Sequence, residues 1–233
     1  MKEQIVPDVP GWLTEREGGH LYEWARACPR DQAIVEIGAF KGKSTICLAR
    51  GARDGSRAEV YSIDPHCGED NDYVEYIRNL ERAGVNDLVT PMVMPSADAA
   101  GRWRGSIGLL FIDGNHLYRF VRQDVQLWYP FLAAGGIIAL HDTTAAIRHR
   151  MSGYCGPQVV ADRCIFFSTS VASAGCVDTI SYGRRGDVGV AAMATKMAVR
   201  GRKLPRDVVM WLNTLADASG AIGRVKKKMI GSI

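Results

Sequence analysis

Residues 33–44, AIVEIGAFKGKS, constrain the fold of this chain more than any other stretch. An apolar, β-branched run ends at an acid, a glycine-bearing turn follows, and Ser44 stands at the start of a helical pattern. This order is typical of a buried strand, a turn that faces a nucleotide-like ligand, and a helix. The kind of ligand depends on how many residues separate the glycines.

A phosphate-binding P-loop needs four residues between its first glycine and the Gly-Lys-Ser/Thr group. Here Gly38 and Gly42 enclose only three residues, and Glu36 stands in the strand just before them. A carboxylate there would repel a triphosphate, whereas it would suit a cofactor that carries positive charge. A P-loop NTPase stays open as an alternative, because the Lys-Ser pair after the turn and the apolar run into Asp113 imitate its two signature elements.

Composition describes an ordinary soluble globular protein, since 47% of the 233 residues are hydrophobic and 23% are charged. No apolar run is long enough to span a membrane, and the first residues lack the pattern of a signal peptide, so we expect a cytoplasmic protein. The formal charge of +4 is too mild to predict nucleic acid as a partner.

Short β-branched runs alternate with longer helical patterns along most of the chain. We expect strands at 33–39, 59–64, 89–94, 106–113 and 135–142, and helices at 14–27, 43–52, 73–85 and 118–133. Such alternation predicts right-handed crossovers and a mainly parallel sheet, which is an α/β, Rossmann-like doubly wound fold. Two further runs, 164–170 and 177–183, are too close together for a helix between them, so they predict an antiparallel hairpin that closes the sheet.

This pattern divides the chain into three expected parts. Residues 1–29 would form a helical segment that folds over the site as a lid, with Trp12 among its aromatic side chains. Residues 30–185 would form the catalytic domain. Residues 186–233 would form a helical extension with a basic tail, which could pair two subunits or serve a non-catalytic binding module.

Ligands bind at the carboxyl ends of the strands in an open parallel sheet. All five expected strands end in or next to polar residues, and those that we assign to a cofactor are Glu36, Gly38, Ser44, Asp64, Ser96, Asp98 and Asp113. Asp64, at the end of the second strand, can accept hydrogen bonds from a ribose diol. Ser96 and Asp98 follow the third strand, where an adenine would lie, although we prefer a helix N-cap for Ser96.

Asp113 and Asp142 follow two strands that we expect to be neighbours. Two carboxylates in one crevice repel each other unless a cation neutralises them, and an oxygen-rich site suits Mg²⁺. His141 is a third candidate ligand, or else a satisfied core histidine. His116, three residues beyond Asp113, is placed to act as a general base, or else it is a surface turn residue.

The motifs EIGAFKGKST, YSIDPH, LLFIDGNHLY and GGIIALHDT together resemble the class I S-adenosylmethionine-dependent methyltransferases. Across residues 30–170, the chain is similar to the metal-dependent O-methyltransferases of sugars and small molecules. The resemblance implies S-adenosylmethionine as cofactor and Asp64 as the ribose acid, with Asp113 as a metal ligand and His116 as the base. The later acidic pair of that family reads His141-Asp142 here, so one ligand departs from the pattern.

The resemblance also implies a small-molecule or oligosaccharide acceptor, with a methylmannose oligosaccharide as its most specific form. Residues 143–163 are polar, contain glycine and proline, and directly follow the metal candidates. We therefore expect this loop to contact the acceptor through Arg148, His149 and Tyr154, unless it is only a solvated connector.

Overall fold

The computed structural model describes residues 5–67, 72–144 and 156–201. The strands are β1 (Ala33–Ile37), β2 (Val60–Ile63), β3 (Val89–Met92), β4 (Ile107–Ile112), β5 (Leu132–Leu140), β6 (Val171–Val177) and β7 (Ile180–Arg185). The α-helices are α1 (Glu15–Arg26), α2 (Lys43–Asp54), α3 (Asp72–Arg82), α4 (Ser96–Arg102), α5 (Tyr118–Trp128) and α7 (Gly156–Ala161), followed by a helix over 190–201. Short 3₁₀ turns at Asn86–Leu88 and Tyr129–Phe131 and a π-helical turn at Asp162–Phe166 complete the described elements.

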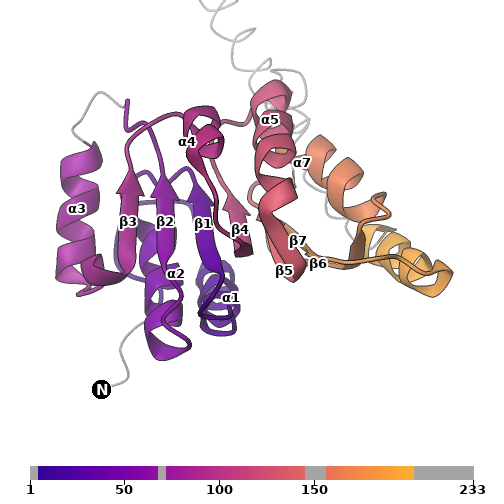
Figure 1. The fold of residues 1–233 in the computed structure, drawn as a ribbon, viewed down its shortest axis with the longest axis horizontal. Helices are drawn as coiled ribbons and strands as arrows, with labels where there is room; N and C mark the ends of the chain where they lie inside the picture. Colours follow the sequence, from indigo (N-terminus) through magenta and orange to yellow (C-terminus); the bar gives the residue numbers. More distant parts are fainter. Residues whose placement is uncertain (1–4, 68–71, 145–155, 202–233) are drawn as a thin grey trace, which may run out of the picture.

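The seven strands form one sheet in the order β3-β2-β1-β4-β5-β7-β6 (Figure 1). The first five strands in this order run parallel to one another, and β7 pairs antiparallel with both β5 and β6. The strand order reverses between β1 and β4, which is where an open α/β sheet binds its ligand. The Rossmann-like fold predicted from the sequence is confirmed.

Helices cover both faces of the sheet and divide the core into two clusters of buried side chains. One cluster joins α1, α2 and α3 to the sheet through residues such as Leu21, Ile46 and Tyr76. The other joins α4, α5 and α7 to the opposite face through residues such as Trp103 and Trp128. Because both faces are covered, β4 is buried along its whole length, as its unbroken apolar sequence predicts.

The hairpin lies at the predicted edge, but its first strand was predicted at the wrong residues. Residues 164–170 are not a strand, because the π-helical turn at Asp162–Phe166 occupies their first part and β6 begins only at Val171. Ile165 and Phe166 are fully buried against the core in this turn. A short apolar run has no periodicity that separates a strand from a buried helical turn, so the sequence pattern was ambiguous here.

Helix α1 begins with a capping box that also anchors the N-terminal part of the chain. Thr14 accepts a hydrogen bond from the backbone N–H of Glu17, and the Glu17 carboxylate accepts one from the backbone N–H of Thr14. Thr14 and Arg16 both bind Asp178 in the β6-β7 turn. The start of α1 is therefore tied to the far edge of the sheet.

The helices of the described residues include no candidate membrane span.

Candidate active site

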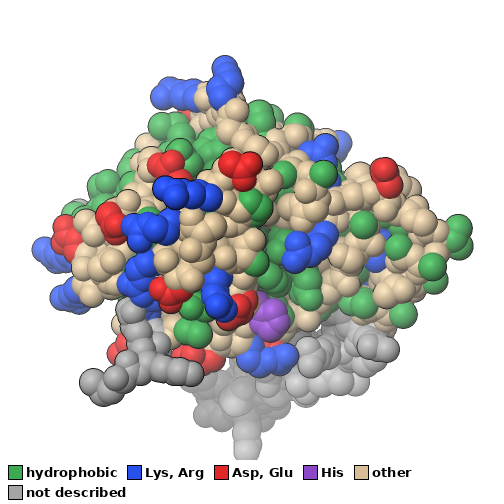
Figure 2. Space-filling model, turned by 60° about the horizontal axis from the view of Figure 1, so that its bottom comes forward, with side chains coloured by type: hydrophobic (Ala, Val, Ile, Leu, Met, Phe, Trp, Pro, Cys, Tyr) green, Lys and Arg blue, Asp and Glu red, His purple; other side chains and the backbone are tan. Residues whose placement is uncertain are grey.

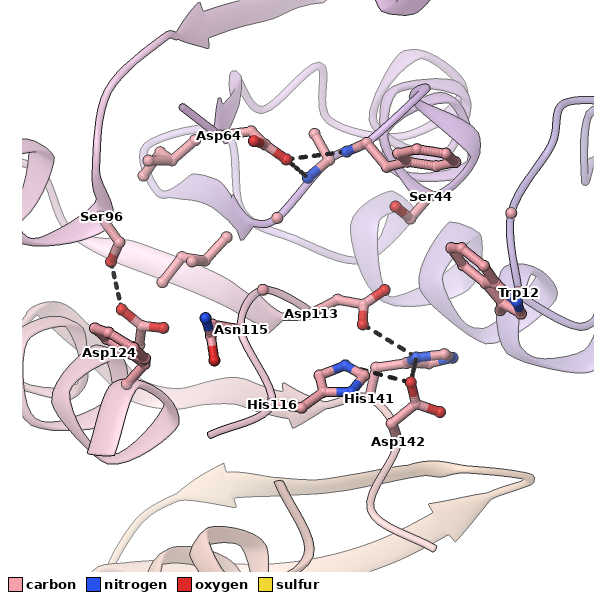
Figure 3. A pocket seen from close by; sticks show the side chains of 18 of the residues that line it. Trp12, Ser44, Asp64, Ser96, Asp113, Asn115, His116, Asp124, His141 and Asp142 are labelled. Atoms are coloured by element: carbon pink, nitrogen blue, oxygen red, sulfur yellow. Dashed lines mark hydrogen bonds and ion pairs between the residues drawn. The ribbon is translucent and has the colours of Figure 1, made fainter. Parts of the chain in front are cut away.

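A cavity of about 940 Å³ opens at the carboxyl ends of the parallel strands. Its walls come from the turn after β1, the ends of β2, β4 and β5, the starts of α4 and α5, and the N-terminal segment before α1. Figure 3 shows that its polar side chains form two groups, one around Asp64 and Ser96 and the other around Asp113 and Asp142. We call these the cofactor half and the metal half.

On the face that Figure 2 shows, Lys/Arg and Asp/Glu side chains are interspersed without a large patch of one sign.

The turn after β1 forms the floor of the cofactor half. Gly38 has a φ of +87°, and a Cβ at this position would lie 2.3 Å from the backbone oxygen of Asp113. Only glycine permits this approach between the ends of β1 and β4. Ser44, buried at the start of α2, also lines the cavity.

Asp64 holds this turn in place. Its Oδ2 accepts hydrogen bonds from the backbone N–H groups of Ala39 and Phe40 at 2.8 and 3.0 Å, and its Oδ1 accepts one from His66 at 2.8 Å. Phe40 has a φ of +47°, a strained value for an aromatic residue. Since these turn amides point at Asp64, they are not presented to a phosphate as a P-loop requires.

Glu36 lies behind the turn and does not line the cavity, which corrects the expectation that it contacts the cofactor. It is fully buried, and it accepts hydrogen bonds from Thr45 Oγ1 at 2.5 Å and Ser62 Oγ at 3.0 Å. Burial raises the pKa of Glu36 to about 7, although these hydroxyl groups oppose the shift. Successive strand residues point to opposite faces, so Glu36 and its neighbour Ile37, which does line the cavity, face different ways.

The residues after β3 differ from expectation in two ways. Pro95 occupies the N-cap position of α4, so Ser96 is the first helical residue and does not cap the helix. Asp98 is exposed in the first turn of α4 and does not line the cavity. Ser96 instead donates a hydrogen bond to Asp124 Oδ1 at 2.7 Å and accepts one from Trp128 Nε1 at 2.9 Å. Asp124, on α5, is a cavity residue that the sequence analysis did not identify.

The metal half brings three predicted side chains together. Asp113, His141 and Asp142 each offer one ligand atom, and these atoms all lie within 4.8 Å of one another. His141 Nδ1 is 3.1 Å from Asp113 Oδ1 and 3.5 Å from Asp142 Oδ2. His116 Nε2 lies 3.4 Å from Asp142 Oδ2, at the edge of the same group (Figure 3).

Charge and burial oppose each other in this group. Burial disfavours the charged form of His141, but Asp113, Asp142 and Glu17 outweigh it and raise the pKa of His141 to about 12. Burial raises the pKa of Asp113, with His141 acting against the shift. In Asp142 the burial effect is outweighed by His141 and His116, which lower its pKa. These shifts describe a positively charged His141 held among carboxylates, and a divalent cation beside Asp113 and Asp142 would compete with that charge for the same oxygens.

Glu17 supports His141 from behind, and the sequence analysis missed this role. Glu17 is fully buried, and its Oε2 lies 3.3 Å from His141 Nε2. Its Oε1 accepts hydrogen bonds from the backbone N–H and hydroxyl group of Thr179 at 2.8 and 2.7 Å. These donors and His141 outweigh burial and lower the pKa of Glu17 to about 2. The only signal in the sequence was the capping box, which predicts a helix start and no contact with β5.

The mouth of the cavity carries two aromatic side chains. The Trp12 ring is 80% exposed, and its centroid lies 5.7 Å from that of Phe40. Trp12 belongs to the segment that we expected to act as a lid, and this segment does line the cavity. Arg148, His149 and Tyr154, the predicted acceptor contacts, lie outside the described residues.

Residues 35–143 match the family model described as a methyltransferase domain. The chain is 33% identical over 129 residues to a catechol O-methyltransferase of Mycobacterium tuberculosis, a match that covers 50% of this chain and 56% of that protein. The chain spans about half the length of this relative and of a second, uncharacterised one, and 15% of the length of a third.

Solved structures share the fold. The cofactor-bound Rv0187 protein of M. tuberculosis superposes with a TM-score of 0.61 at 21% identity, covering 78% of this chain and 84% of that one. The O-methyltransferase TomG of Streptomyces achromogenes, solved with S-adenosylmethionine, superposes with a TM-score of 0.59 at 19% identity, covering 75% and 82%. The chain therefore has the Rossmann-like fold of the class I methyltransferases.

Proposed function

We propose that this protein is an S-adenosylmethionine-dependent O-methyltransferase that uses a divalent cation and acts on a hydroxyl group of a small molecule or oligosaccharide. The observation that carries the proposal is the set of residues that line this cavity. One half is a glycine turn organised by Asp64, and the other half gathers Asp113, His141 and Asp142 beside His116. The family match over residues 35–143 supports the same activity.

The cofactor half fits S-adenosylmethionine. Asp64 Oδ2 already accepts two hydrogen bonds from the turn amides, and Oδ1 accepts one from the backbone N–H of His66. Oδ1 therefore keeps a lone pair for a ribose hydroxyl group. Gly38 and Ser44 line the path from Asp64 to the metal half, where the methionine end of the cofactor would lie. We do not assign Glu36 and Asp98 to this binding, because neither lines the cavity.

The metal half fits a divalent cation by its donor set. Two carboxylates and one imidazole nitrogen converge, and the buried His141 Nδ1 has no hydrogen-bond partner of good geometry among the described residues. Contact of Nε2 with Glu17 leaves Nδ1 as the ring nitrogen that faces Asp113 and Asp142. Asp113, His141 and Asp142 would hold the ion, and Mg²⁺ remains the ion that we expect.

The chemistry assigned to this chain is alignment and proton transfer. Methyl transfer from a sulfonium is an in-line displacement, so the walls must align the acceptor oxygen with the methyl group and exclude water. A bound cation would lower the pKa of the acceptor hydroxyl group. His116, at the edge of the metal half, would accept the proton of that hydroxyl group.

The acceptor that we favour is a sugar or oligosaccharide. The narrow resemblance to the mycobacterial methylmannose polysaccharide 1-O-methyltransferase motivates a methylmannose oligosaccharide. The exposed Trp12 ring beside Phe40 supports this class, because aromatic rings stack on the apolar faces of sugars. A catechol is the second candidate, because a catechol O-methyltransferase is among the relatives, and it would stack on the same rings.

Purified protein incubated with S-adenosylmethionine, Mg²⁺ and panels of sugar and catechol acceptors tests the proposal. We expect mass spectrometry to detect an acceptor that is heavier by one methyl group, and we expect excess chelator to abolish the product. Tight binding of ATP without binding of S-adenosylmethionine would support the NTPase alternative. A role for the basic C-terminal residues beyond 201 lies outside the described residues.

A further inference from the structure

We propose that Asp124 is a specificity residue for the cofactor, and that its free carboxylate oxygen accepts a hydrogen bond from the exocyclic amine of an adenine ring. This inference rests on the proposed function, because it takes S-adenosylmethionine as the occupant of the cavity. The expected set of cofactor residues does not include Asp124, which comes from α5 and not from a strand end.

The position of Asp124 follows from that of Ser96. Ser96 begins α4 directly after β3, at the point of the cavity where the adenine lies if the ribose is on Asp64. Asp124 reaches the same point from the neighbouring helix α5, and its side chain faces the cavity beside Ser96 and Asn115 (Figure 3).

A chain of hydrogen bonds fixes the orientation of this carboxylate. Trp128 Nε1 donates to Ser96 Oγ, and Ser96 Oγ donates to Asp124 Oδ1. Trp128 is fully buried, so the chain starts from a rigid part of the core. Oδ2 has no hydrogen-bond partner among the described residues, yet the residue as a whole is only 8% exposed. Asp124 Oδ2 is therefore a hydrogen-bond acceptor of fixed orientation that faces the cavity and has no protein donor among the described residues.

The chemistry of the adenine supplies the missing donor. An ionised carboxylate has no proton to donate and only accepts hydrogen bonds, so Oδ2, which is open to the cavity, needs a donor from the ligand that displaces water there. The exocyclic amine is the only hydrogen-bond donor on the adenine ring of the cofactor. Burial raises the pKa of Asp124 to about 6, and a donor on Oδ2 would favour its charged form.

Binding of three ligands by calorimetry tests the proposal. S-adenosylhomocysteine carries the amine, its 6-deamino purine analogue lacks it, and its inosine analogue carries an oxygen in its place. We expect the wild-type protein to bind S-adenosylhomocysteine about 10- to 100-fold more tightly than either analogue, the usual weight of a hydrogen bond to a charged group. This comparison of three ligands uses only the wild-type protein, so a variant that fails to fold cannot affect its result.

Asp124→Asn should change the preference, because the asparagine amide can donate to the oxygen of the inosine analogue. We expect the ratio of the two affinities to shift by at least about tenfold toward the inosine analogue. Asp98→Asn is the matched control: this carboxylate is exposed on α4 and outside the cavity, so the ratio should stay at the wild-type value.

The possible failures are distinguishable. If the wild-type protein binds S-adenosylhomocysteine tightly but binds all three ligands equally, Asp124 does not read the amine and only this inference is overturned. If Asp124→Asn weakens all three ligands by the same factor, the residue only supports Ser96, which also overturns it. If the wild-type protein binds none of them, the proposed function fails and this inference fails with it.

Discussion

The two halves of the cavity are built in different ways, although they share one floor. The cofactor half is mostly local: Gly38 and Ser44 lie on one turn, and Asp64 lies at the end of the adjacent strand. The metal half draws on distant parts of the chain, because His141, directly after β5, contacts Glu17 on α1, and Glu17 in turn binds Thr179 in the hairpin. Only the first kind of site leaves a compact motif in the sequence.

The two halves also treat buried acid differently. Behind the cofactor half, Glu36 has two hydroxyl partners and its pKa is raised to about 7. Behind the metal half, Glu17 has backbone, hydroxyl and imidazole partners and its pKa is lowered to about 2. Neither side chain is exposed to solvent, but Glu36 is the more deeply buried of the two and Glu17 has the imidazole partner that Glu36 lacks. The depth of burial and the kind of partner together decide whether each acid is charged. We expect substitutions in each half to affect one function and spare the other.

The largest expected effect is loss of turnover when the cation site is disabled. Asp142→Ala or excess chelator should abolish methyl transfer, because the acceptor hydroxyl group would no longer be activated. Calorimetry should still show binding of S-adenosylhomocysteine, since Asp142 lies in the other half of the cavity. Full turnover of the wild-type protein in chelator would mean that Asp113 and Asp142 serve only as a charge group around His141.

Removal of the proposed base should have the next largest effect. We expect His116→Ala to lower turnover by about 10²–10⁴-fold with cofactor and cation binding retained, and to remove the acid limb of the pH-rate profile. His141→Asn is the internal control, since it should weaken cation binding more than it alters the profile. If His141→Asn removes the acid limb while His116→Ala keeps both the rate and the limb, His141 is the base.

Asp64→Ala should affect the cofactor half alone. We expect affinity for S-adenosylhomocysteine to fall by about 1–3 kcal/mol, because charge-assisted hydrogen bonds to the ribose and to the turn amides of Ala39 and Phe40 are both lost. Mn²⁺ affinity, measured by electron paramagnetic resonance, should not change. Unaltered cofactor affinity in a folded Asp64→Ala protein would exclude the ribose assignment.

The smallest effect on turnover is expected from the buried glutamates, whose pH dependence of stability should have opposite signs. The folded-state pKa of Glu36 lies above its usual 4.5, so its burial costs stability as the pH rises from 4.5 to about 7. The free energy of unfolding of Glu36→Gln, relative to that of the wild type, should therefore increase by on the order of 1–3 kcal/mol between these pH values, as measured by urea unfolding.

The folded-state pKa of Glu17 lies below 4.5, so its contribution is present above pH 4.5 and is lost as the pH falls toward 2. Glu17→Gln should therefore be destabilised relative to wild type at pH 7, with the difference narrowing in acid. If the change in the free energy of unfolding depends on pH in the same way for both variants, the environments of Glu17 and Glu36 do not differ as described.

The sequence predicted the fold well because the fold rests on local patterns, and it identified several residues that line the cavity for the same reason. Alternating strands and helices specified the sheet, and Asp64, Gly38, Asp113 and His141 follow from the rule that ligands bind at strand ends. Glu36 was assigned wrongly because its place in the motif does not reveal which face of β1 it occupies. The 164–170 strand was wrong because a short apolar run fits either a strand or a buried helical turn.

The site residues that the sequence analysis did not identify were missed for one physical reason. Glu17 and Asp124 lie on helices and reach the cavity only through tertiary packing, and no spacing in the sequence links them to His141 or Ser96. The same holds for Ser96, whose hydroxyl group was predicted to cap α4 but is bonded to a side chain 28 positions away.

A crystal structure of the protein soaked with S-adenosylhomocysteine and Mn²⁺, with anomalous maps, tests the division of the cavity most directly. We expect the ribose on Asp64 and one anomalous peak about 2.0–2.3 Å from Asp113, His141 Nδ1 and Asp142, with His116 facing the space between the ion and the cofactor. A nucleoside that does not contact Asp64, or a cofactor-bound structure without a metal peak among those three side chains, would contradict the account.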